Sequence, residues 1–443
     1  MIPLLSIKAE PNISECLPPV NSNPQRVHIA VFGTFGVGNL GNECTLQAVL
    51  SNLRRFLPNA ELTCICSDAE EAAADYGISA FPIRYVVPVD QLFGSYAHSK
   101  NIFIKGVRKL LRLSTSPYRW YKAFRILKSQ DALLIIGLGM LGDFGISAFG
   151  LHYDILGWCL LAKVCRCKLE FVSVGVGPIR DRVSKVFVKT ALALGDYRSY
   201  RDTFSKDYVQ GMGPSIKNDR VYPDLAFSLP RPSLSPSPSS GSKRTVIGLG
   251  LIPYYGRRGR LEDGDRTYRK YVDSVAGLTC KLMDDGFAVR LLIGDVRYDH
   301  EIRADLRASL EARGQQYVDA RLIDEPASSV SELLSQLAMT DLVVASRFHN
   351  VLLSIVLGKP VVALSYHEKV ASLMDEFGLS EFCHDIEDFD SDKLIAQIAI
   401  LGDGKANFKG QTPTARQAEN YRKALDDQYE RICRSLATCI ARQ

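Results

Sequence analysis

The sequence lacks the segments that mark an exported or membrane-spanning protein. No stretch approaches the roughly 20 apolar residues that a membrane-spanning helix needs. The short apolar run at residues 1–7 has no preceding basic region and is broken by Lys8 and Glu10, so it does not predict an export signal. We therefore expect a cytoplasmic protein.

The sequence also lacks a disulfide or zinc pattern. Its eleven cysteines are an odd number, and most lie in apolar or strand-like runs. The pairs Cys64/Cys66 and Cys165/Cys167 have the wrong spacing for a zinc knuckle and no nearby histidine. This pattern predicts buried thiols in a reducing compartment and no structural metal.

Two common catalytic signatures are missing, and a third is only partly present. The chain has no P-loop and no G-x-S-x-G elbow. G-x-G-x-x-G occurs at residues 36–41, but Gly33 already ends the preceding strand, and Asp68 lies beyond the position of the usual acidic residue. Dinucleotide binding is thus a weak alternative, and we predict no cofactor.

What is present is a long chain of ordinary globular composition. Its 443 residues, 46% hydrophobic and 23% charged, are too many for one core and suit two domains. Residues 1–25 resemble a loose tail, and the Pro- and Ser-rich residues 230–243 resemble a linker. The predicted domains are therefore residues 26–229 and 244–443.

Each half alternates apolar strands with helices. In the first half, a strand at 26–33 leads through a Gly-rich turn into a helix at 44–57 and a second strand at 61–67. This is the opening βαβ unit of a doubly wound sheet, so we predict α/β architecture in both halves. The long charged helix at 415–440 could cross back onto the first domain.

Cationic and titratable side chains follow two consecutive strands of the second half. The strand at 342–346 ends in Arg347-Phe348-His349, and the strand at 361–365 ends in Tyr366-His367-Glu368-Lys369. Ligands of open α/β sheets bind at the carboxyl ends of the strands, so this pattern predicts a site for an anionic small molecule. The structural alternative is a surface arginine and a histidine that caps a helix.

A basic segment interrupts the first half. Residues 100–128 hold nine Lys or Arg and no acidic residue, interleaved with apolar and aromatic side chains at roughly helical spacing. Such a segment is typical of peripheral contact with an anionic membrane surface. A solvated basic face packed on the domain is the equally weighted alternative.

Taken together and in order, several turns resemble the polysaccharide pyruvyltransferase family. The similar positions span about residues 31–379 and are Gly33-x-x-Gly-x-Gly-Asn-x-Gly-x-Glu43, the Gly-rich turn ending in Asp143, Gly175-x-Gly-Pro-Ile179, Arg201-Asp-x-x-Ser205, Pro223-Asp-x-Ala-Phe227, Arg347-Phe-His349 and Tyr366-x-x-Lys369. The chain departs from the family pattern at Asn42, where Asp is common, and at Gly137–Met140.

The resemblance implies transfer of a pyruvyl group from phosphoenolpyruvate to two hydroxyls of a sugar, which forms a cyclic ketal and releases phosphate. It also implies two Rossmann-like domains that face a cleft, as in two-domain (GT-B-like) glycosyltransferases. The acceptor would be a sugar of an exopolysaccharide or cell-surface glycan. If that acceptor is a lipid-linked oligosaccharide, residues 100–128 could dock the enzyme on the membrane.

The chemistry of the donor suggests roles for the residues at these turns. Arg347 and Lys369, with Arg201 less certain, would hold the phosphate and carboxylate, because cations bind oxyanions. His349 would be the general acid/base and Asp143 would position the acceptor. A further set binds the acceptor or stabilises the first turn: Gly38, Asn39, Gly41 and Glu43.

Two other functions are compatible with the same architecture. A nucleotide-sugar-dependent glycosyltransferase would need a pocket for base and ribose in the second domain. A catalytically inactive relative that only binds ligand would regulate polysaccharide assembly without turnover. The intact cationic cluster favours an enzyme over the binding protein.

Overall fold

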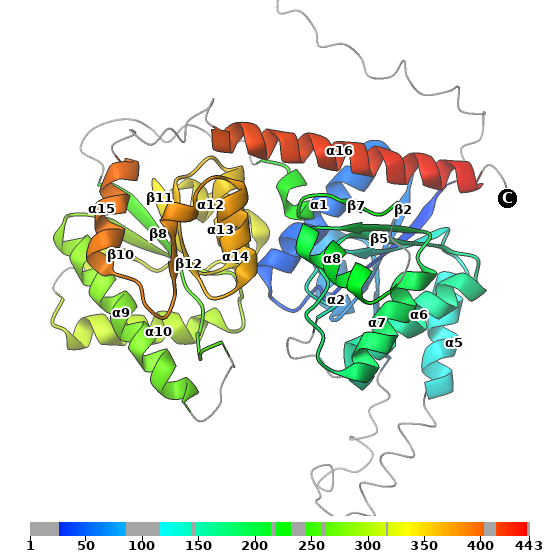
Figure 1. The fold of residues 1–443 in the computed structure, drawn as a ribbon, viewed down its shortest axis with the longest axis horizontal. Helices are drawn as coiled ribbons and strands as arrows, with labels where there is room; N and C mark the ends of the chain where they lie inside the picture. The colour runs from blue at the N-terminus through cyan, green and yellow to red at the C-terminus, as the bar shows by residue number, and fades with distance from the viewer. Residues whose placement is uncertain are drawn as a thin grey trace, which may run out of the picture.

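The computed structural model describes residues 26–85, 116–142, 148–213, 218–231, 244–257, 263–315, 318–402 and 413–440. Figure 1 shows two α/β lobes side by side, with a long helix running across the top. We call residues 26–231 the first domain and residues 244–402 the second. The fold confirms the prediction of two Rossmann-like α/β domains.

The first domain is built on a seven-stranded sheet in the order β3-β2-β1-β4-β5-β6-β7. All of its strand pairs are parallel. The central strands are apolar runs with helices on both faces, the pattern expected when both faces of a sheet are covered. The strands are β1 (His28–Phe32), β2 (Glu61–Cys66), β3 (Ser79–Pro82), β4 (Ala132–Ile136), β5 (Lys168–Val174), β6 (Tyr197–Tyr200) and β7 (Arg220–Val221).

The helices of the first domain follow the strands in the usual alternation. Helix α1 begins earlier than predicted, because Asn39 caps it by accepting a hydrogen bond from the backbone N–H of Asn42. The helical segments are α1 (Leu40–Phe56), α2 (Ala69–Tyr76), α5 (Ser116–Leu127), η3 (Ala148–His152), α6 (Tyr153–Val164), α7 (Arg182–Leu194), α8 (Thr203–Gly211) and η4 (Leu225–Ser228).

The second domain repeats the plan with a six-stranded parallel sheet in the order β10-β9-β8-β11-β12-β13. Its strands are β8 (Val246–Gly250), β9 (Ala288–Leu292), β10 (Leu322–Ile323), β11 (Leu342–Ala345), β12 (Val361–Ser365) and β13 (Cys383–Asp385). Its helical segments are α9 (Gly264–Asp284), α10 (Asp299–Ala312), α11 (Val318–Arg321), α12 (Val330–Ala338), α13 (Phe348–Val356), α14 (Glu368–Glu376), η5 (Ser380–Phe382) and α15 (Ser391–Gly402).

The register of the second sheet brings the predicted cationic turns to one edge. Strand β11 lies between β8 and β12, with Val343 paired to Val361 and Ala345 to Gly250. The strands are parallel, so the residues that follow β11 and β12 leave the sheet at the same edge. The turns that begin at Arg347 and Tyr366 therefore lie side by side.

The last helix, α16 (Pro413–Ile440), joins the two domains. Near its start, Tyr421 donates a hydrogen bond to Glu376 of α14, 2.6 Å away. Further along, the amide nitrogen of Gln428 donates to the hydroxyl of Ser199 in the first domain at 2.7 Å. The helix thus returns to the first domain, as the sequence allowed.

The predicted linker lies mostly outside the described residues, so the domain boundaries stay a prediction. The cysteines in the described parts of the chain are all free thiols. Among the helices that the structure describes, none has both the length and the apolar character needed to cross a bilayer.

Candidate functional site

The two domains are joined by a short backbone contact between one turn from each. The N–H of Leu40 in the first domain donates to the carbonyl of Gly294 at 2.9 Å, and the N–H of Val296 donates to the carbonyl of Gly38 at 2.8 Å. Asn39 and Asp295 thereby form an isolated antiparallel bridge. This contact places the Gly-rich turn of the first domain against the loop that follows β9.

Beside that contact, His349 of the second domain packs against Gly41 of the first. A Cβ atom on Gly41 would lie 2.1 Å from Nδ1 of His349, far closer than non-bonded atoms approach. Only glycine at this position allows the imidazole to sit where it does. The sequence predicted both residues for the site, and the structure brings them into direct contact.

The guanidinium of Arg347 is bound by an acidic residue that the sequence reasoning did not select. Its Nε donates to Oδ2 of Asp299 at 3.0 Å, and Nη2 is paired with Oδ1 of the same carboxylate. The Oδ2 atom also accepts hydrogen bonds from the backbone N–H groups of Gly294 and Asp295, at 2.7 and 2.9 Å. Asp299 therefore fixes both Arg347 and the loop that meets the first domain.

Two further predicted cations lie over the ring of Phe348. Nζ of Lys369 is 5.6 Å from the ring centroid, and Cζ of Arg201 is 5.8 Å from it. Arg201 comes from the first domain, and a Cβ on Gly175 would come within 2.6 Å of its Nε. The structure thus brings Arg201, the least certain of the predicted donor ligands, to the same cluster as Lys369.

Burial and the mutual repulsion of the positive charges in this cluster lower the pKa values of its titratable members, His349 and Lys369. Burial lowers the pKa of His349 to about 4; Asp224 acts in the opposite direction, and the nearby Lys369, Arg201 and Arg347 act in the same direction as burial. Burial and the two arginines also lower the pKa of Lys369 to about 8. The Nε2 atom of His349 is shielded from solvent and has no hydrogen-bond partner within the described part of the protein. A bound oxyanion would relieve the mutual repulsion of the cations.

Asp224 is a second carboxylate that sequence reasoning left without a role. Its Oδ1 accepts a hydrogen bond from the backbone N–H of Ala226 at 3.0 Å and so caps η4. Its Oδ2 lies 3.7 Å from Nη1 of Arg201. The only signal in the sequence was its place in the Pro223-Asp-x-Ala-Phe227 motif.

The polar residues of the Gly-rich turn bond mainly to the turn itself. Oε1 of Glu43 accepts from the N–H of Gly36 at 2.9 Å, and its Oε2 accepts from the hydroxyl of Tyr76 at 2.9 Å. Burial raises the pKa of Glu43, although these hydrogen bonds act in the opposite direction. Gly38 has a φ of +80°, which favours glycine. These contacts support the structural role for Asn39 and Glu43.

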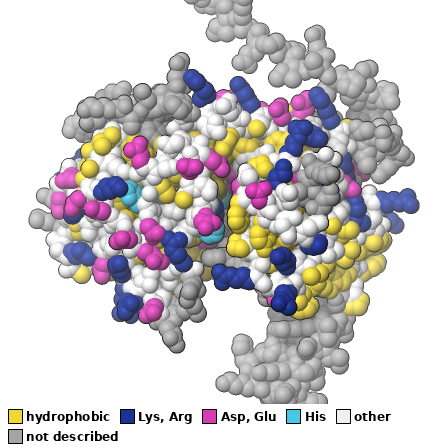
Figure 2. Space-filling view, in the orientation of Figure 1, with side chains coloured by type: hydrophobic (Ala, Val, Ile, Leu, Met, Phe, Trp, Pro, Cys, Tyr) yellow, Lys and Arg dark blue, Asp and Glu magenta, His cyan; other side chains and the backbone are white. Residues whose placement is uncertain are grey.

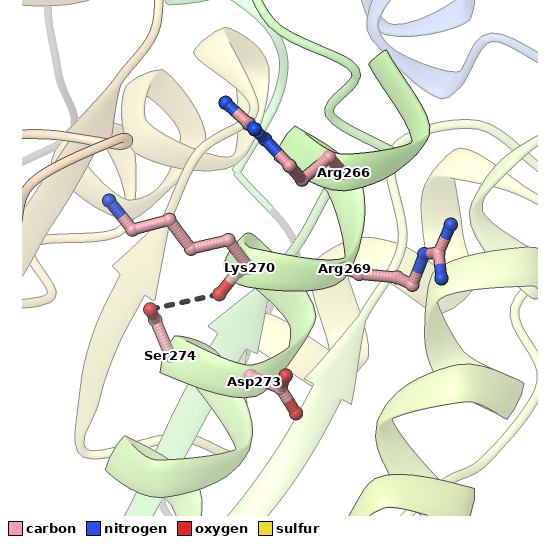
Figure 3. A pocket seen from close by; sticks show the side chains of 5 residues that line it. All are labelled: Arg266, Arg269, Lys270, Asp273 and Ser274. Atoms are coloured by element: carbon pink, nitrogen blue, oxygen red, sulfur yellow. Dashed lines mark hydrogen bonds between the residues drawn. The ribbon is translucent and has the colours of Figure 1, made fainter. Parts of the chain in front are cut away.

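One predicted residue falls outside the described part of the chain, and one pocket lies apart from this cluster. Asp143 is outside the described residues, so its role stays a prediction. A shallow hollow is lined by Arg266, Arg269, Lys270, Asp273 and Ser274, all from one helix, α9. Figure 3 shows that its basic side chains diverge instead of converging on one point. Across the described residues, no three His, Cys, Asp or Glu side chains are grouped closely enough to hold a metal ion.

Comparison with solved structures supports the fold and its class. The chain is similar to UDP-GlcNAc 2-epimerase from Neisseria meningitidis, with a TM-score of 0.52, 11% identity, and coverage of 90% of this chain and 99% of that one. The enzymes from Methanocaldococcus jannaschii and Rickettsia bellii both give TM-scores of 0.54 at 11% identity, covering 90% and 94% of this chain and 99% and 98% of theirs. The protein therefore has the two-domain, GT-B-like architecture.

Comparison of sequences identifies the family. The family described as polysaccharide pyruvyl transferase matches residues 39–368, which include the turn at Arg347–His349 and end one residue before Lys369. The chain belongs to this family, whose name describes a transferase. It is also 21% identical over 421 residues to amylovoran biosynthesis protein AmsJ of Erwinia amylovora, covering 88% of this chain and 96% of the relative.

Proposed function

We propose that the protein transfers the pyruvyl group of phosphoenolpyruvate to two hydroxyls of a glycan sugar. The observation that carries this proposal is the convergence of Arg201, Arg347 and Lys369 around His349. Phosphoenolpyruvate brings two anionic groups, a phosphate and a carboxylate, which match a cluster of cations supplied by both domains. Membership of the family supports the reaction type.

The three cations would divide the work of holding the donor. Asp299 takes the Nε–Nη2 edge of Arg347, so an oxyanion would meet the remaining Nη1 side of the guanidinium. Lys369 and Arg201 share the ring of Phe348 and would approach the same ligand from opposite domains. Donor binding would therefore also hold the two domains together.

The reaction needs one proton delivered to carbon and two hydroxyl protons removed. Protonation of the methylene carbon of the enol phosphate makes the adjacent carbon electrophilic. The first sugar hydroxyl adds there, phosphate leaves with its electron pair, and the second hydroxyl closes the ketal. Of the two hydroxyl protons, one replaces the proton given to the methyl group and the other leaves on phosphate.

We assign the movement of these protons to His349. Its ring is neutral at pH 7, because its pKa is lowered to about 4 by burial and by the neighbouring cations. A bound phosphate and carboxylate would offset those cations and raise the pKa towards the working pH of a general acid/base. We assign Asp143 to acceptor positioning on the family resemblance, and Gly38 and Gly41 to shaping the cleft.

The acceptor is proposed from the family and from the named relative. The family name refers to a polysaccharide, and the name of AmsJ refers to amylovoran biosynthesis. We propose that the acceptor is a sugar of an exopolysaccharide or cell-surface glycan, presented on a lipid-linked oligosaccharide. The site would lie on the cytoplasmic side of the membrane, with no cofactor beyond the donor substrate.

A product assay tests the proposal. The protein is incubated with phosphoenolpyruvate and the lipid-linked oligosaccharides of the cells that make it. We expect acceptor-dependent release of phosphate and a glycan whose mass has grown by one pyruvate less one water. Mild acid should remove the added group, because ketals are acid-labile. Phosphate release without glycan modification would contradict the proposal.

A nucleotide-sugar-dependent glycosyltransferase remains the alternative, because the similar solved structures are UDP-GlcNAc enzymes by name. At 11% identity that similarity shows the fold alone. The two hypotheses are distinguished by incubating the protein and the same acceptors with either UDP-N-acetylglucosamine or phosphoenolpyruvate. Sugar transfer in the first mixture and no product in the second would favour the alternative.

A further inference from the structure

One outer face of the first domain exposes a group of large apolar side chains to solvent. Helix α6 packs against both α5 and α7, and η3 packs on α6 and α7. We call the outward side of these four elements the α5–α7 face. Its exposed apolar residues are Tyr118, Tyr121, Phe149, Leu160, Val164, Val183 and Val186. Figure 2 shows hydrophobic side chains gathered where Figure 1 places α6 and α7, with Lys and Arg around them.

The most exposed of these side chains packs against other aromatic rings. Phe149 is 71% exposed, yet its ring lies 5.8 Å from that of Phe187 and 6.4 Å from that of Tyr153. Tyr153 in turn meets Trp120 of α5 edge-on, at 5.9 Å. The cluster links all four elements, so Phe149 projects from a packed base. An apolar patch of this kind marks an interaction surface.

The charged residues on the helices of this face are mainly basic, with the exposed Asp181 at the N-cap of α7 as an acidic neighbour. Exposed Arg125 on α5, and Arg182, Lys185 and Lys189 on α7, lie among the apolar residues. Within the described residues of the four elements, the single acidic side chain is Asp154. It is buried and bound by Arg84 and Arg119, so it does not reach the surface.

We propose that the α5–α7 face binds the surface of an anionic lipid bilayer. Valine and phenylalanine side chains would enter the outer acyl region, the hydroxyls of Tyr118 and Tyr121 would stay at headgroup level, and the cations would meet lipid phosphates. The proposal concerns lipid binding and does not depend on the pyruvyl-transfer chemistry.

Charge complementarity argues against two other occupants of this face. A second copy packed face to face would bring Lys185 and Lys189 against the cations of its partner. Residues 100–115 of this chain contain Lys and Arg and no acidic residue, so they would also be repelled. An anionic bilayer is the partner that satisfies both the apolar and the basic parts of the face.

The face also adjoins the domain edge that carries a predicted donor ligand. Nζ of Lys185 lies 5.8 Å from the ring centroid of Tyr208 on α8. Helix α8 begins just after Arg201, and the hydroxyl of Tyr208 donates to the carbonyl of Ile179 at 3.1 Å. A bilayer on the α5–α7 face would therefore lie on the side of the first domain that leads towards the cationic cluster.

Vesicle flotation with the full chain tests the proposal. The vesicles contain phosphatidylcholine with phosphatidylglycerol, or phosphatidylcholine alone. The variant Arg125→Gln/Lys185→Gln/Lys189→Gln removes three exposed cations from the face. The matched control is Arg266→Gln/Arg269→Gln/Lys270→Gln, which removes three exposed cations from α9. Neither set includes a residue of the candidate site.

We expect wild type and the α9 variant to float with the anionic vesicles and not with the neutral ones. The triple variant of the face should lose on the order of 100-fold in partitioning, and added salt should weaken binding of the wild type. Equal loss in both triple variants would show binding by net charge alone and would overturn the proposal. Unchanged binding of the face variant would overturn it as well.

A second pair of variants tests the apolar part of the face. Val164→Ser/Val186→Ser changes two exposed residues of the face, and Met339→Ser/Ile400→Ser changes two exposed residues of the second domain. Only the first pair should weaken flotation. If that pair instead turns a dimer into a monomer in size-exclusion chromatography and leaves flotation unchanged, the face is an interface between copies and the proposal is wrong.

Discussion

The turns that precede α1 and α13 both connect a buried strand to a helix, but they differ in the partners of their polar side chains. Each follows a buried strand, and the two meet where His349 touches Gly41. In the α1 turn, Asn39 and Glu43 bond to backbone N–H groups of the turn itself. At the α13 turn, Arg347 is paired with Asp299, Lys369 and Arg201 lie nearby, and Nε2 of His349 is buried without a hydrogen-bond partner among the described residues.

The difference separates residues that stabilise the fold from residues that serve a ligand. A buried carboxylate that accepts two hydrogen bonds lowers the free energy of the folded state, and removing it leaves its donors unsatisfied. Burial, Arg201 and Arg347 lower the pKa of Lys369, so the charged lysine raises the free energy of the folded state, and an anion bound beside it would offset this cost. Changes in the two turns should therefore move stability and activity in opposite directions.

The largest effect should follow removal of the histidine. We expect His349→Ala to reduce turnover by about 100- to 10,000-fold, the usual contribution of a general acid/base, with little change in thermal unfolding. Steady-state kinetics and differential scanning fluorimetry measure the two quantities. The control is His300→Ala, an exposed histidine on α10, which should turn over normally. Ordinary turnover of the His349 variant would remove the residue from the mechanism.

Substitution of Gly41, the first-domain partner of His349, should also break the contact between the two turns. In Gly41→Ala, the new Cβ would meet Nδ1 of His349 at 2.1 Å, so the imidazole must move. A misplaced catalytic group costs about 100-fold in rate, and we expect a loss of that order. The matched control is Gly277→Ala in helix α9, where a Cβ meets nothing within 4 Å. An active Gly41→Ala protein would show that the ring position is not needed.

Substitution of Glu43 and substitution of Lys369 should change the stability of the protein in opposite directions. Glu43→Ala leaves the N–H of Gly36 and the hydroxyl of Tyr76 without their acceptor, so unfolding should become easier by roughly 1–3 kcal/mol. Lys369→Met removes a charge that burial and two arginines oppose, so the melting temperature should rise while donor affinity falls. Donor affinity and melting temperature that fall together in Lys369→Met would contradict this contrast.

A smaller effect is expected from pH. The pKa of Lys369 is lowered to about 8 by burial, Arg201 and Arg347, so the folded protein releases this proton before the unfolded chain does. Between about pH 8 and its ordinary value of 10.5, this lysine makes the folded state more stable as pH rises. Donor affinity should change in the other direction and weaken above pH 8, because the cation is lost.

The variant Lys369→Arg is the control for this pH effect. Arginine stays charged throughout this range, so in Lys369→Arg any donor binding that remains should be flat across pH 7–9. Isothermal titration calorimetry with phosphoenolpyruvate at several pH values measures both proteins. Parallel pH profiles for wild type and Lys369→Arg would assign the titration to another group.

The sequence predicted the strands, the turns and the residues that follow them, because apolar runs and glycines are local signals. It also selected Arg347, His349 and Lys369 from their place after two strands. It did not predict that Asp299 would bind Arg347, since that pairing joins positions that are far apart in the chain. The approach of Arg201 to Phe348 depends on how the two domains meet, and no local pattern carries that information.

The most direct test of the account is the thermal stability of wild type and Lys369→Met with and without phosphoenolpyruvate. A donor at 100 times its dissociation constant should stabilise the wild type by about 2.7 kcal/mol. We predict this shift for wild type, a much smaller one for Lys369→Met, and none with UDP-N-acetylglucosamine. A shift with the nucleotide sugar and none with phosphoenolpyruvate would contradict the proposed role of the cationic cluster.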